Sequence, residues 1–251
     1  MNQSKILVNG KFSPDDLVVS VSESNRKIDP KIEGQLDALW EAKVKRAKEN
    51  GITNCYNGIS YRINTIEEKG GKLVIDFGTF EYKVRDGLIE IPEYFNLPEE
   101  YYRKGCFNRA TIKTRDDKYL MVELSGKSFN SYKIDFVGGI MEVNVPIMSG
   151  KDVFESMYVE LEEEAGIEKD DIAEIYLRAV YLRPNTNVCF LFGVDLRVSS
   201  FELLARFSNN KDADIRSLKT YSEKEYWDYL KNCGEESKQS LCEILQSTSC
   251  Q

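Results

Sequence analysis

The sequence Gly138-Gly-Ile-Met-Glu142 is followed, after a spacer, by Gly150-Lys-Asp-Val-Phe-Glu-Ser-Met-Tyr-Val-Glu-Leu-Glu-Glu-Glu-Ala-Gly-Ile167. The glycine pair predicts a tight turn after a strand. The second part predicts a helix over residues 151–166 that ends at Gly166. Its apolar positions recur at helical spacing: Phe154, Met157, Tyr158, Leu161 and Ala165. We therefore interpret this region as a strand, a glycine turn and an acidic helix.

Three glutamates of this predicted helix, Glu160, Glu163 and Glu164, share one face, and Glu164 borders the apolar stripe. Like charges at this spacing destabilise a helix by roughly 0.2–0.5 kcal/mol per pair. A hard cation such as Mg²⁺, which prefers oxygen ligands, would relieve the repulsion. A solvated acidic face explains most glutamate runs, but the preceding glycine turn and the terminating Gly166 favour a metal site here.

The composition excludes several classes of chemistry. Of the 251 residues, 41% are hydrophobic and 30% are charged, which is typical of a globular protein. The net charge of −8 disfavours a nucleic-acid partner. Histidine is absent, which excludes Ser-His-Asp triads and histidine-type zinc sites. A carboxylate is therefore the expected base in any proton transfer.

The chain lacks a signal-peptide pattern at its start and any apolar run of the roughly 20 residues that a membrane span requires. Its six cysteines include no Cys-x-x-Cys pair, which favours a reducing compartment. We expect a cytoplasmic protein without a membrane partner.

Along the rest of the chain, apolar spacing predicts irregularly alternating helices and strands. A helix is expected over 31–50, and the segment after residue 196 is expected to be mostly helical, with core positions at Tyr226, Trp227, Leu230, Leu241, Ile244 and Leu245. The expected strands cover 5–8, 17–21, 60–66, 73–77, 80–84, 110–114, 119–124, 173–182 and 188–196. The stretch 92–104 is the candidate domain boundary. This pattern favours a mixed sheet covered by helices.

The acidic helix and its glycine turn resemble the box of the Nudix hydrolases. Its second half matches in register, at Glu160, Leu161, Glu163, Glu164, Gly166 and Ile167, and Gly139 matches the opening glycine. Lys151 stands where the family has a glutamate and Val159 where it has an arginine, and the loop is longer. The resemblance implies an α+β fold, a Nudix-type α/β/α sandwich with a mixed sheet. It places an N-terminal α/β subdomain that helps to bind substrate at 1–104 and the hydrolase domain at 105–251.

The N-terminal features, Trp40, Tyr56-Asn-Gly-Ile-Ser-Tyr-Arg-Ile63 and Phe80-Glu-Tyr82-Lys, resemble the UDP-glucose and UDP-galactose diphosphatase branch. That resemblance implies hydrolysis of a UDP-sugar to UMP and sugar 1-phosphate with Mg²⁺, or Mn²⁺, as cofactor. It makes Glu160, Glu163 and Glu164 the catalytic metal ligands. The substrate-binding residues that it implies are Tyr56, Tyr82, Lys127, Asp135, Glu142 and Ser237.

Each substrate residue has a simpler interpretation. The tyrosines could be half-buried packing residues, and Asp135 could form part of a turn before the glycines. Glu142 could be a solvated loop residue, and Ser237 could begin a helix. Arg183 and Asn185, in a loop between strands, could reach a phosphate, although loop residues are usually solvated. Two alternative functions stay open: a Nudix hydrolase for ADP-ribose, a dinucleotide or a free nucleotide, and a nucleotide-binding module without activity. The nucleobase, the general base, the number of metal ions and the oligomeric state are also open.

Overall fold

The structure is a computed structural model that describes residues 4–52, 55–125, 133–207 and 214–233. Within these residues, seven strands form one mixed sheet in the order β1-β8-β9-β5-β6-β10, and β7 pairs with β6. The β5–β9 pair is parallel, whereas the other pairs are antiparallel. The bounds are β1 Lys5–Phe12, β5 Cys106–Lys113, β6 Tyr119–Leu124, β7 Ile134–Asp135, β8 Ile172–Leu182, β9 Val188–Leu196 and β10 Ile215–Tyr221.

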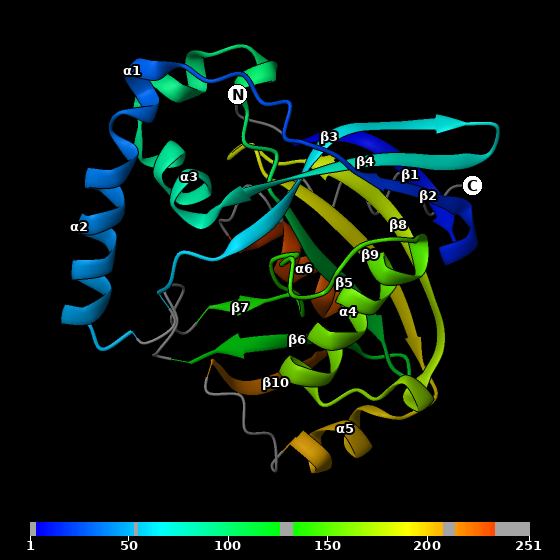
Figure 1. Cartoon of the computed structure of the whole chain (residues 1–251). Helices are drawn as coiled ribbons and strands as arrows, with labels where there is room; N and C mark the ends of the chain where they lie inside the picture. Colours follow the sequence, from blue (N-terminus) through cyan, green and yellow to red (C-terminus); the bar gives the residue numbers. More distant parts are fainter. Residues whose placement is uncertain (1–3, 53–54, 126–132, 208–213, 234–251) are drawn as a thin grey trace.

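A second, three-stranded sheet crosses above the first (Figure 1). Its central strand β4 (Lys72–Glu81) pairs in parallel with β2 (Leu17–Val21) and antiparallel with β3 (Ile59–Lys69). The β3–β4 hairpin turns at Gly70 and Gly71, which both have positive φ. Phe77 of this sheet stacks on Phe190 of the large sheet at 5.9 Å between ring centroids, so the two sheets share one core.

The described helices are α1 Pro30–Glu33, α2 Leu36–Glu49, α3 Tyr82–Gly87, α4 Gly150–Ala165, α5 Ser200–Phe207 and α6 Glu223–Asn232. Short 3₁₀ segments lie at Pro14–Asp16, Leu88–Glu90, Pro92–Asn96, Glu99–Tyr101 and Lys169–Asp171. The helices α2 and α3 pack together at one side of the molecule, away from α4 (Figure 1).

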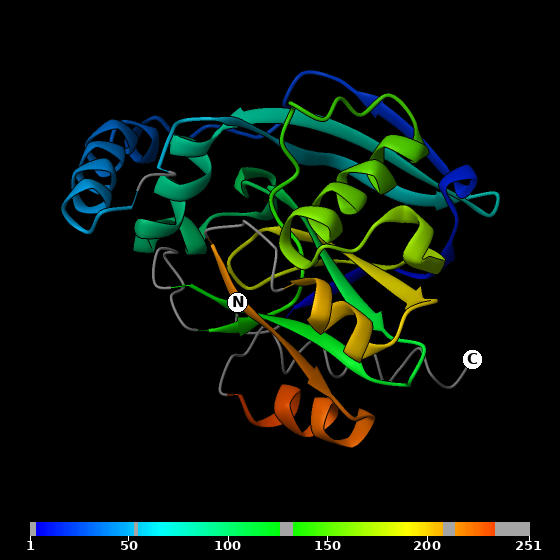
Figure 2. The ribbon, with the colours of Figure 1, turned by 90° about the horizontal axis from the view of Figure 1, so that it is seen from below.

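The large sheet is covered on both faces (Figure 2). On one face, α4 buries Phe154, Met157 and Leu161, and the small sheet lies beside it. On the other face, α6 buries Tyr226 and Leu230 against a separate cluster of sheet residues. The predicted α+β architecture, an α/β/α sandwich around a mixed sheet, is confirmed.

The predicted acidic helix is also confirmed, because α4 spans Gly150–Ala165 and ends at Gly166 in the left-handed conformation, φ +63. Four of the five predicted stripe residues are buried, and Tyr158 is half-buried against the same core. The helix begins at a capping box in which Asp152 accepts hydrogen bonds from Ser149 N and Ser149 Oγ. This sequence therefore fixes the helix at both ends.

Three predictions of local structure were wrong. The strands expected over 73–77 and 80–84 are one strand, β4, which continues through Gly78 to Glu81, and Tyr82 begins α3. The helix expected over 31–50 is divided at Gly34 into α1 and α2. The region after residue 196 also contains the strand β10.

The strand β10 was missed because its buried residues, Ile215 and Leu218, are three apart, which is helical spacing. A register shift between Ile215 and Ser217 places two residues of β10 opposite one of β6. Such a bulge returns Ile215 and Leu218 to the same face of the sheet. Tyr226 and Leu230 of α6 are buried as predicted, whereas Leu241, Ile244 and Leu245 lie outside the described residues.

The domain boundary near residue 104 stays a prediction. The strand β1, which precedes this position, pairs with β8, which follows it. None of the helices in the described ranges is long and apolar enough to span a membrane. In the same ranges, Cys55, Cys106, Cys189 and Cys233 are free thiols.

Candidate functional site

The glycine turn lies directly against the acidic helix. The amide of Gly138 donates a hydrogen bond to Glu164 Oε2 at 2.8 Å. A Cβ atom at Gly139 would lie 2.3 Å from Glu160 Oε1, which is closer than real Cβ atoms approach. Gly138 itself has φ +147, and a Cβ atom there would lie 2.2 Å from the carbonyl oxygen of Asn108 on β5. Gly138 is therefore required by the backbone beside it, and a side chain at Gly139 would displace the carboxylate of Glu160. The turn thus lies against two carboxylates.

Next to this turn is a cavity of about 360 Å³, called here the acidic cavity. Glu160 and Glu163 of α4 line one side of it, and Glu142 lines another. Gly139, Ile140, Asn144, Val145, Ser156, Val159 and Tyr56 complete the lining. The structure thus brings two of the predicted metal glutamates to one cavity with two of the predicted substrate residues.

The carboxylate of Glu142 is held by both predicted tyrosines. Tyr56 donates to Glu142 Oε1 at 2.6 Å, Tyr82 donates to the same oxygen, and the two rings are 5.6 Å apart. The hydrogen bond to Glu142 raises the pKa of Tyr56, whereas burial, followed by that bond, raises the pKa of Tyr82. Both hydroxyls therefore stay protonated near neutral pH and act as donors that fix Glu142 at the cavity wall.

The acidic cavity suits a divalent cation in its donor atoms. Glu160 and Glu163 offer carboxylate oxygens, and the missing Cβ of Gly139 leaves room beside Glu160. Mg²⁺ is usually held by one or two carboxylates together with waters and substrate phosphates. Within the described residues, no group of three or more acidic or cysteine side chains converges as a metal site, and Glu164 is engaged with Gly138. A three-glutamate ligand set stays a prediction.

The structure describes both residues that depart from the Nudix pattern. Lys151 is exposed on the first turn of α4, and Val159 lines the acidic cavity beside Glu160. The long loop before α4 is braced by other groups. Asp152 accepts from Met148 N at 2.9 Å and Ser149 N at 2.7 Å, and the Tyr61 hydroxyl accepts from Ile147 N at 3.0 Å. These hydrogen bonds hold the loop in place before α4.

The other predicted substrate residues lie elsewhere. Asp135, on β7, forms an ion pair with Arg109 at 3.0 Å and lines a different cavity. Lys127 and Ser237 lie outside the described residues. Arg183 and Asn185 are half-buried, not fully solvated as loop residues usually are, and they line the same cavity as Asp135.

This second cavity, called here the arginine cavity, measures about 270 Å³ and is lined by both glycines of the turn. It shares Gly139 and Ile140 with the acidic cavity. Its cationic lining residues within the described chain are Arg85, Arg103, Arg109 and Arg183. Sequence reasoning missed the first three. Arg109 lies inside β5, whose first seven residues are buried, and a buried charged residue needs a reason. The expected strand began at residue 110, so no signal in the sequence pointed to Arg109.

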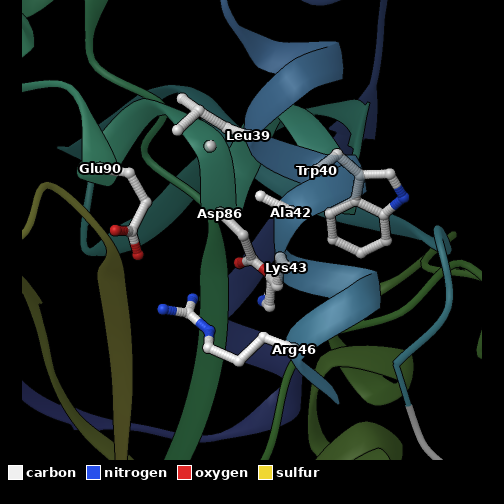
Figure 3. Close-up of a pocket in the computed structure, with 8 residues that line it drawn as sticks. Leu39, Trp40, Ala42, Lys43, Arg46, Asp86 and Glu90 are labelled. Carbon is white, nitrogen blue, oxygen red and sulfur yellow. The ribbon is translucent and has the colours of Figure 1, made fainter. Parts of the chain in front are cut away.

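A third cavity, of about 310 Å³, lies between α2 and the segment after β4 (Figure 3). Trp40, Lys43 and Arg46 line it from α2, and Asp86 and Glu90 line it from the other side. Lys43 forms an ion pair with Asp86 and lies 5.5 Å from the centre of the Trp40 ring. Asp86 also lines the arginine cavity, so the two cavities are neighbours.

Comparisons with known proteins give a partial likeness. No protein-family model and no curated protein matches the chain. Among solved structures, it is similar to a protein from Deinococcus radiodurans, at 15% identity and a TM-score of 0.40 over 57% of this chain and 82% of the other. It is also similar to a NUDIX hydrolase from Nitrosomonas europaea, at 19% identity and a TM-score of 0.37 over 58% and 90%. What the site does is therefore judged from its own residues.

Proposed function

We propose that the chain is a metal-dependent, Nudix-type hydrolase that cleaves the diphosphate of a nucleoside diphosphate derivative. One observation carries the proposal: the glycine turn lies against Glu160 and Glu164 at the edge of a cavity that Glu160 and Glu163 line. A solvated acidic face would need neither the close approach at Gly139 nor a hydrogen bond from the Gly138 amide. The arrangement is suited to holding a cation against a phosphorylated ligand.

Glu160 and Glu163, with Glu164 as the third predicted ligand, are the residues that would hold Mg²⁺ or Mn²⁺. A divalent cation held there would lower the pKa of a bound water and would offset the negative charge on phosphoryl oxygens. The chain itself is acidic, with a net charge of −8, so a phosphorylated substrate needs such compensation before it can lie next to α4.

The reaction is the attack of water on one phosphorus of the diphosphate. A bond forms between the water oxygen and phosphorus, the bond to the bridging oxygen breaks, and the leaving phosphate keeps that electron pair. A carboxylate at the acidic cavity accepts the proton of the attacking water, since the chain has no histidine. Glu160, Glu163 and Glu142 line the cavity in which this transfer would take place.

A UDP-sugar, cleaved to UMP and sugar 1-phosphate, is the substrate class that we propose. The choice of uridine rests on the resemblance of the N-terminal features. Tyr56 supports a nucleoside diphosphate ligand in general, because it lines the acidic cavity and is 53% exposed, which leaves a ring face for a base or sugar to stack on. ADP-ribose is the alternative within the same chemistry. A nucleotide-binding protein without activity is the alternative outside it, and the apolar Val159 beside the glutamates favours that alternative.

Product analysis with Mg²⁺ tests these functions against one another. UDP-glucose, UDP-galactose, ADP-ribose and a dinucleotide are incubated with the protein, and UMP, AMP and sugar phosphates are quantified. We expect UMP from the UDP-sugars with the natural protein and with Glu162→Gln, because Glu162 is exposed and absent from the cavity lining. Glu163→Gln should abolish the product. Cleavage of ADP-ribose alone would contradict the uridine assignment, and binding without cleavage would contradict the hydrolase.

A further inference from the structure

The arginine cavity carries an excess of positive charge that the mechanism above does not use. In the described chain it is lined by four arginines and two aspartates, Asp86 and Asp135. Asp86 also forms an ion pair with Lys43, so it is shared between two cations. At least two positive charges are left over beside the glycine turn, in a chain whose net charge is −8.

Buried polar atoms in this cavity lack partners. Among the described residues, two guanidinium nitrogens, Arg85 Nη1 and Arg183 Nε, are buried without a hydrogen-bond partner. A buried donor without an acceptor costs about 1–3 kcal/mol, and a charged donor costs more. Burial, followed by the neighbouring charge of Arg109, lowers the pKa of Arg183. An anion in the cavity would offset the positive charge of both guanidinium groups.

The guanidinium groups are held in place before any ligand arrives. Arg103 donates from Nε to the carbonyl of Asn185 at 3.0 Å and from Nη1 to the carbonyl of Arg85. Arg183 and Arg109 lie over the ring of Phe107 at 5.1 and 5.5 Å from its centre. These contacts join α3, β5 and the loop after β8, and they reduce the side-chain entropy that binding would otherwise cost.

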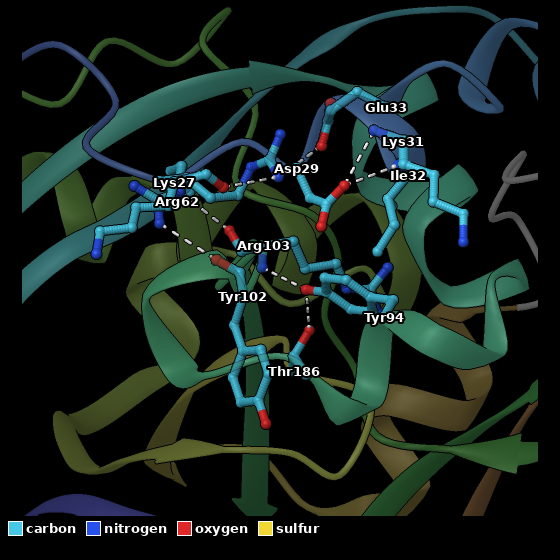
Figure 4. A network of polar contacts seen from close by, with 11 residues as sticks. Lys27, Asp29, Lys31, Ile32, Glu33, Arg62, Tyr94, Tyr102, Arg103 and Thr186 are labelled. Atoms are coloured by element: carbon cyan, nitrogen blue, oxygen red, sulfur yellow. Dashed lines mark hydrogen bonds and ion pairs between the residues drawn. The ribbon is translucent and has the colours of Figure 1, made fainter.

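A buried network of hydrogen bonds holds the backbone of Arg103 in place (Figure 4). Its backbone amide donates to the Tyr94 hydroxyl at 2.6 Å, which is 2.9 Å from Thr186 Oγ1. Arg62 donates from Nε to the carbonyl of Arg103 at 3.1 Å. Both sides of the arginine cavity, the 94–103 segment and the 183–187 loop, are thereby fixed to each other.

We propose that the arginine cavity is a phosphate site that holds the second phosphoryl group of the diphosphate, next to the acidic cavity that would hold the metal. The proposal rests on the proposed function for the identity of the substrate. Gly139 and Ile140 line both cavities, so the two cavities adjoin, as the two phosphoryl groups of one diphosphate require. The phosphoryl group at the glutamates is attacked by water, and the group at the arginines leaves as a phosphomonoester with the electron pair of the broken bond. Arg183 and Arg109 stabilise its added negative charge.

Binding of inorganic phosphate tests the site without the reaction. Isothermal titration calorimetry is done on the full chain with EDTA present, so that no divalent metal contributes to phosphate binding. Arg183→Met should weaken phosphate binding by about tenfold, because a charge-assisted hydrogen bond is lost. Arg115→Met is the matched control, since Arg115 is exposed and pairs with Glu202 at the surface. It should leave the affinity unchanged.

A second variant should change the phosphate affinity in the opposite direction, and loss of folding cannot produce such an increase. Asp135→Asn removes a negative charge from the cavity and should tighten phosphate binding severalfold. If neither Arg183→Met nor Asp135→Asn changes the phosphate affinity, the proposal is overturned, even when Glu163-dependent hydrolysis is observed. If no diphosphate is hydrolysed but phosphate affinity follows both variants, the phosphate site stands and the hydrolase assignment fails.

Discussion

The acidic cavity and the arginine cavity are both lined by Gly139 and Ile140, yet they are encoded in different ways. Glu160 and Glu163 come from one helix, and their spacing in the sequence is their spacing in space. The four arginines come from α3, the segment before β5, β5 itself and the loop after β8. The pair of glutamates is therefore a local sequence motif. The cluster of arginines forms only when distant segments of the chain pack together.

The largest effect is expected from Glu160→Gln. Loss of a metal ligand should lower kcat/KM by about 10³-fold, which corresponds to roughly 4 kcal/mol of transition-state stabilisation. Phosphate affinity in EDTA should stay within about twofold, because Glu160 does not line the arginine cavity. Steady-state kinetics and titration on the same preparation measure the two effects. Equal losses in both would show that the cavities are not separable.

The next effect comes from Gly139→Ala, which acts on the wall that the cavities share. The new Cβ atom would collide with the carboxylate of Glu160, a flexible side-chain end that has to move. We expect activity to fall by about 10- to 100-fold with little change in Tm, because displaced ligands weaken metal binding before they weaken the fold. Activity titrated against Mg²⁺ concentration and a thermal melt check this.

Gly138→Ala should, in contrast to Gly139→Ala, affect the stability of the fold. Its Cβ atom would meet the backbone of Asn108, and the residue has φ +147. Backbone cannot give way as a side chain does, so the free energy of unfolding should fall by at least about 2 kcal/mol. A Tm that is as high as that of Gly139→Ala would contradict the close packing of the turn on β5.

A smaller effect is expected from Tyr82→Phe. Glu142 would keep its hydrogen bond from Tyr56 and lose the one from buried Tyr82. A net loss of about 1 kcal/mol corresponds to a roughly fivefold rise in KM for the substrate that is cleaved. Tyr101→Phe is the control, because Tyr101 lies outside the lining of the acidic cavity. An unchanged KM for Tyr82→Phe would show that Glu142 does not help to position substrate.

The smallest effect concerns the loop before α4, and it depends on pH. Hydrogen bonds from Met148 and then Ser149 lower the pKa of Asp152 from its ordinary value of 3.8. Asp152 therefore contributes stability above about pH 4, and this contribution is lost as the pH falls through its lowered pKa. Asp152→Ala should lower the unfolding free energy by about 1 kcal/mol at pH 7.

That difference should vanish in strongly acidic solution. Denaturant titrations at pH 7 and below pH 3 measure it, with Lys151→Ala as the exposed neighbouring control. A difference that persists at low pH would mean that the carboxylate charge is not what braces the loop.

The parts of the fold that could be predicted are those encoded locally. The limits of α4 follow from Ser149, Asp152 and Gly166, and its buried face follows from residues at helical spacing. The family resemblance suggested Tyr56, Tyr82 and Glu142 as substrate residues. It did not predict the hydrogen bonds of the tyrosines to Glu142, which join residues 86 and 60 positions apart.

The parts that could not be predicted depend on tertiary context. Ile215 and Leu218 have helical spacing, and a bulge against β6 makes them a strand. Arg103 and Arg183 are ordinary loop arginines in the sequence, and they become a charged cluster when Tyr94 and Thr186 fix their segments together. No local pattern records such a long-range arrangement.

The pairing of β1 with β8 has a practical consequence for shortened forms of the protein. Lys5–Phe12 occupies the outer edge of the large sheet, and Val8 and Phe12 are buried there. A fragment that starts at residue 105 would keep the glycine turn and α4 but would leave the long strand β8 as an uncovered edge. Open edges of this kind invite pairing between chains and precipitation. Efforts to express or crystallise residues 105–251 alone should therefore supply a replacement for this strand.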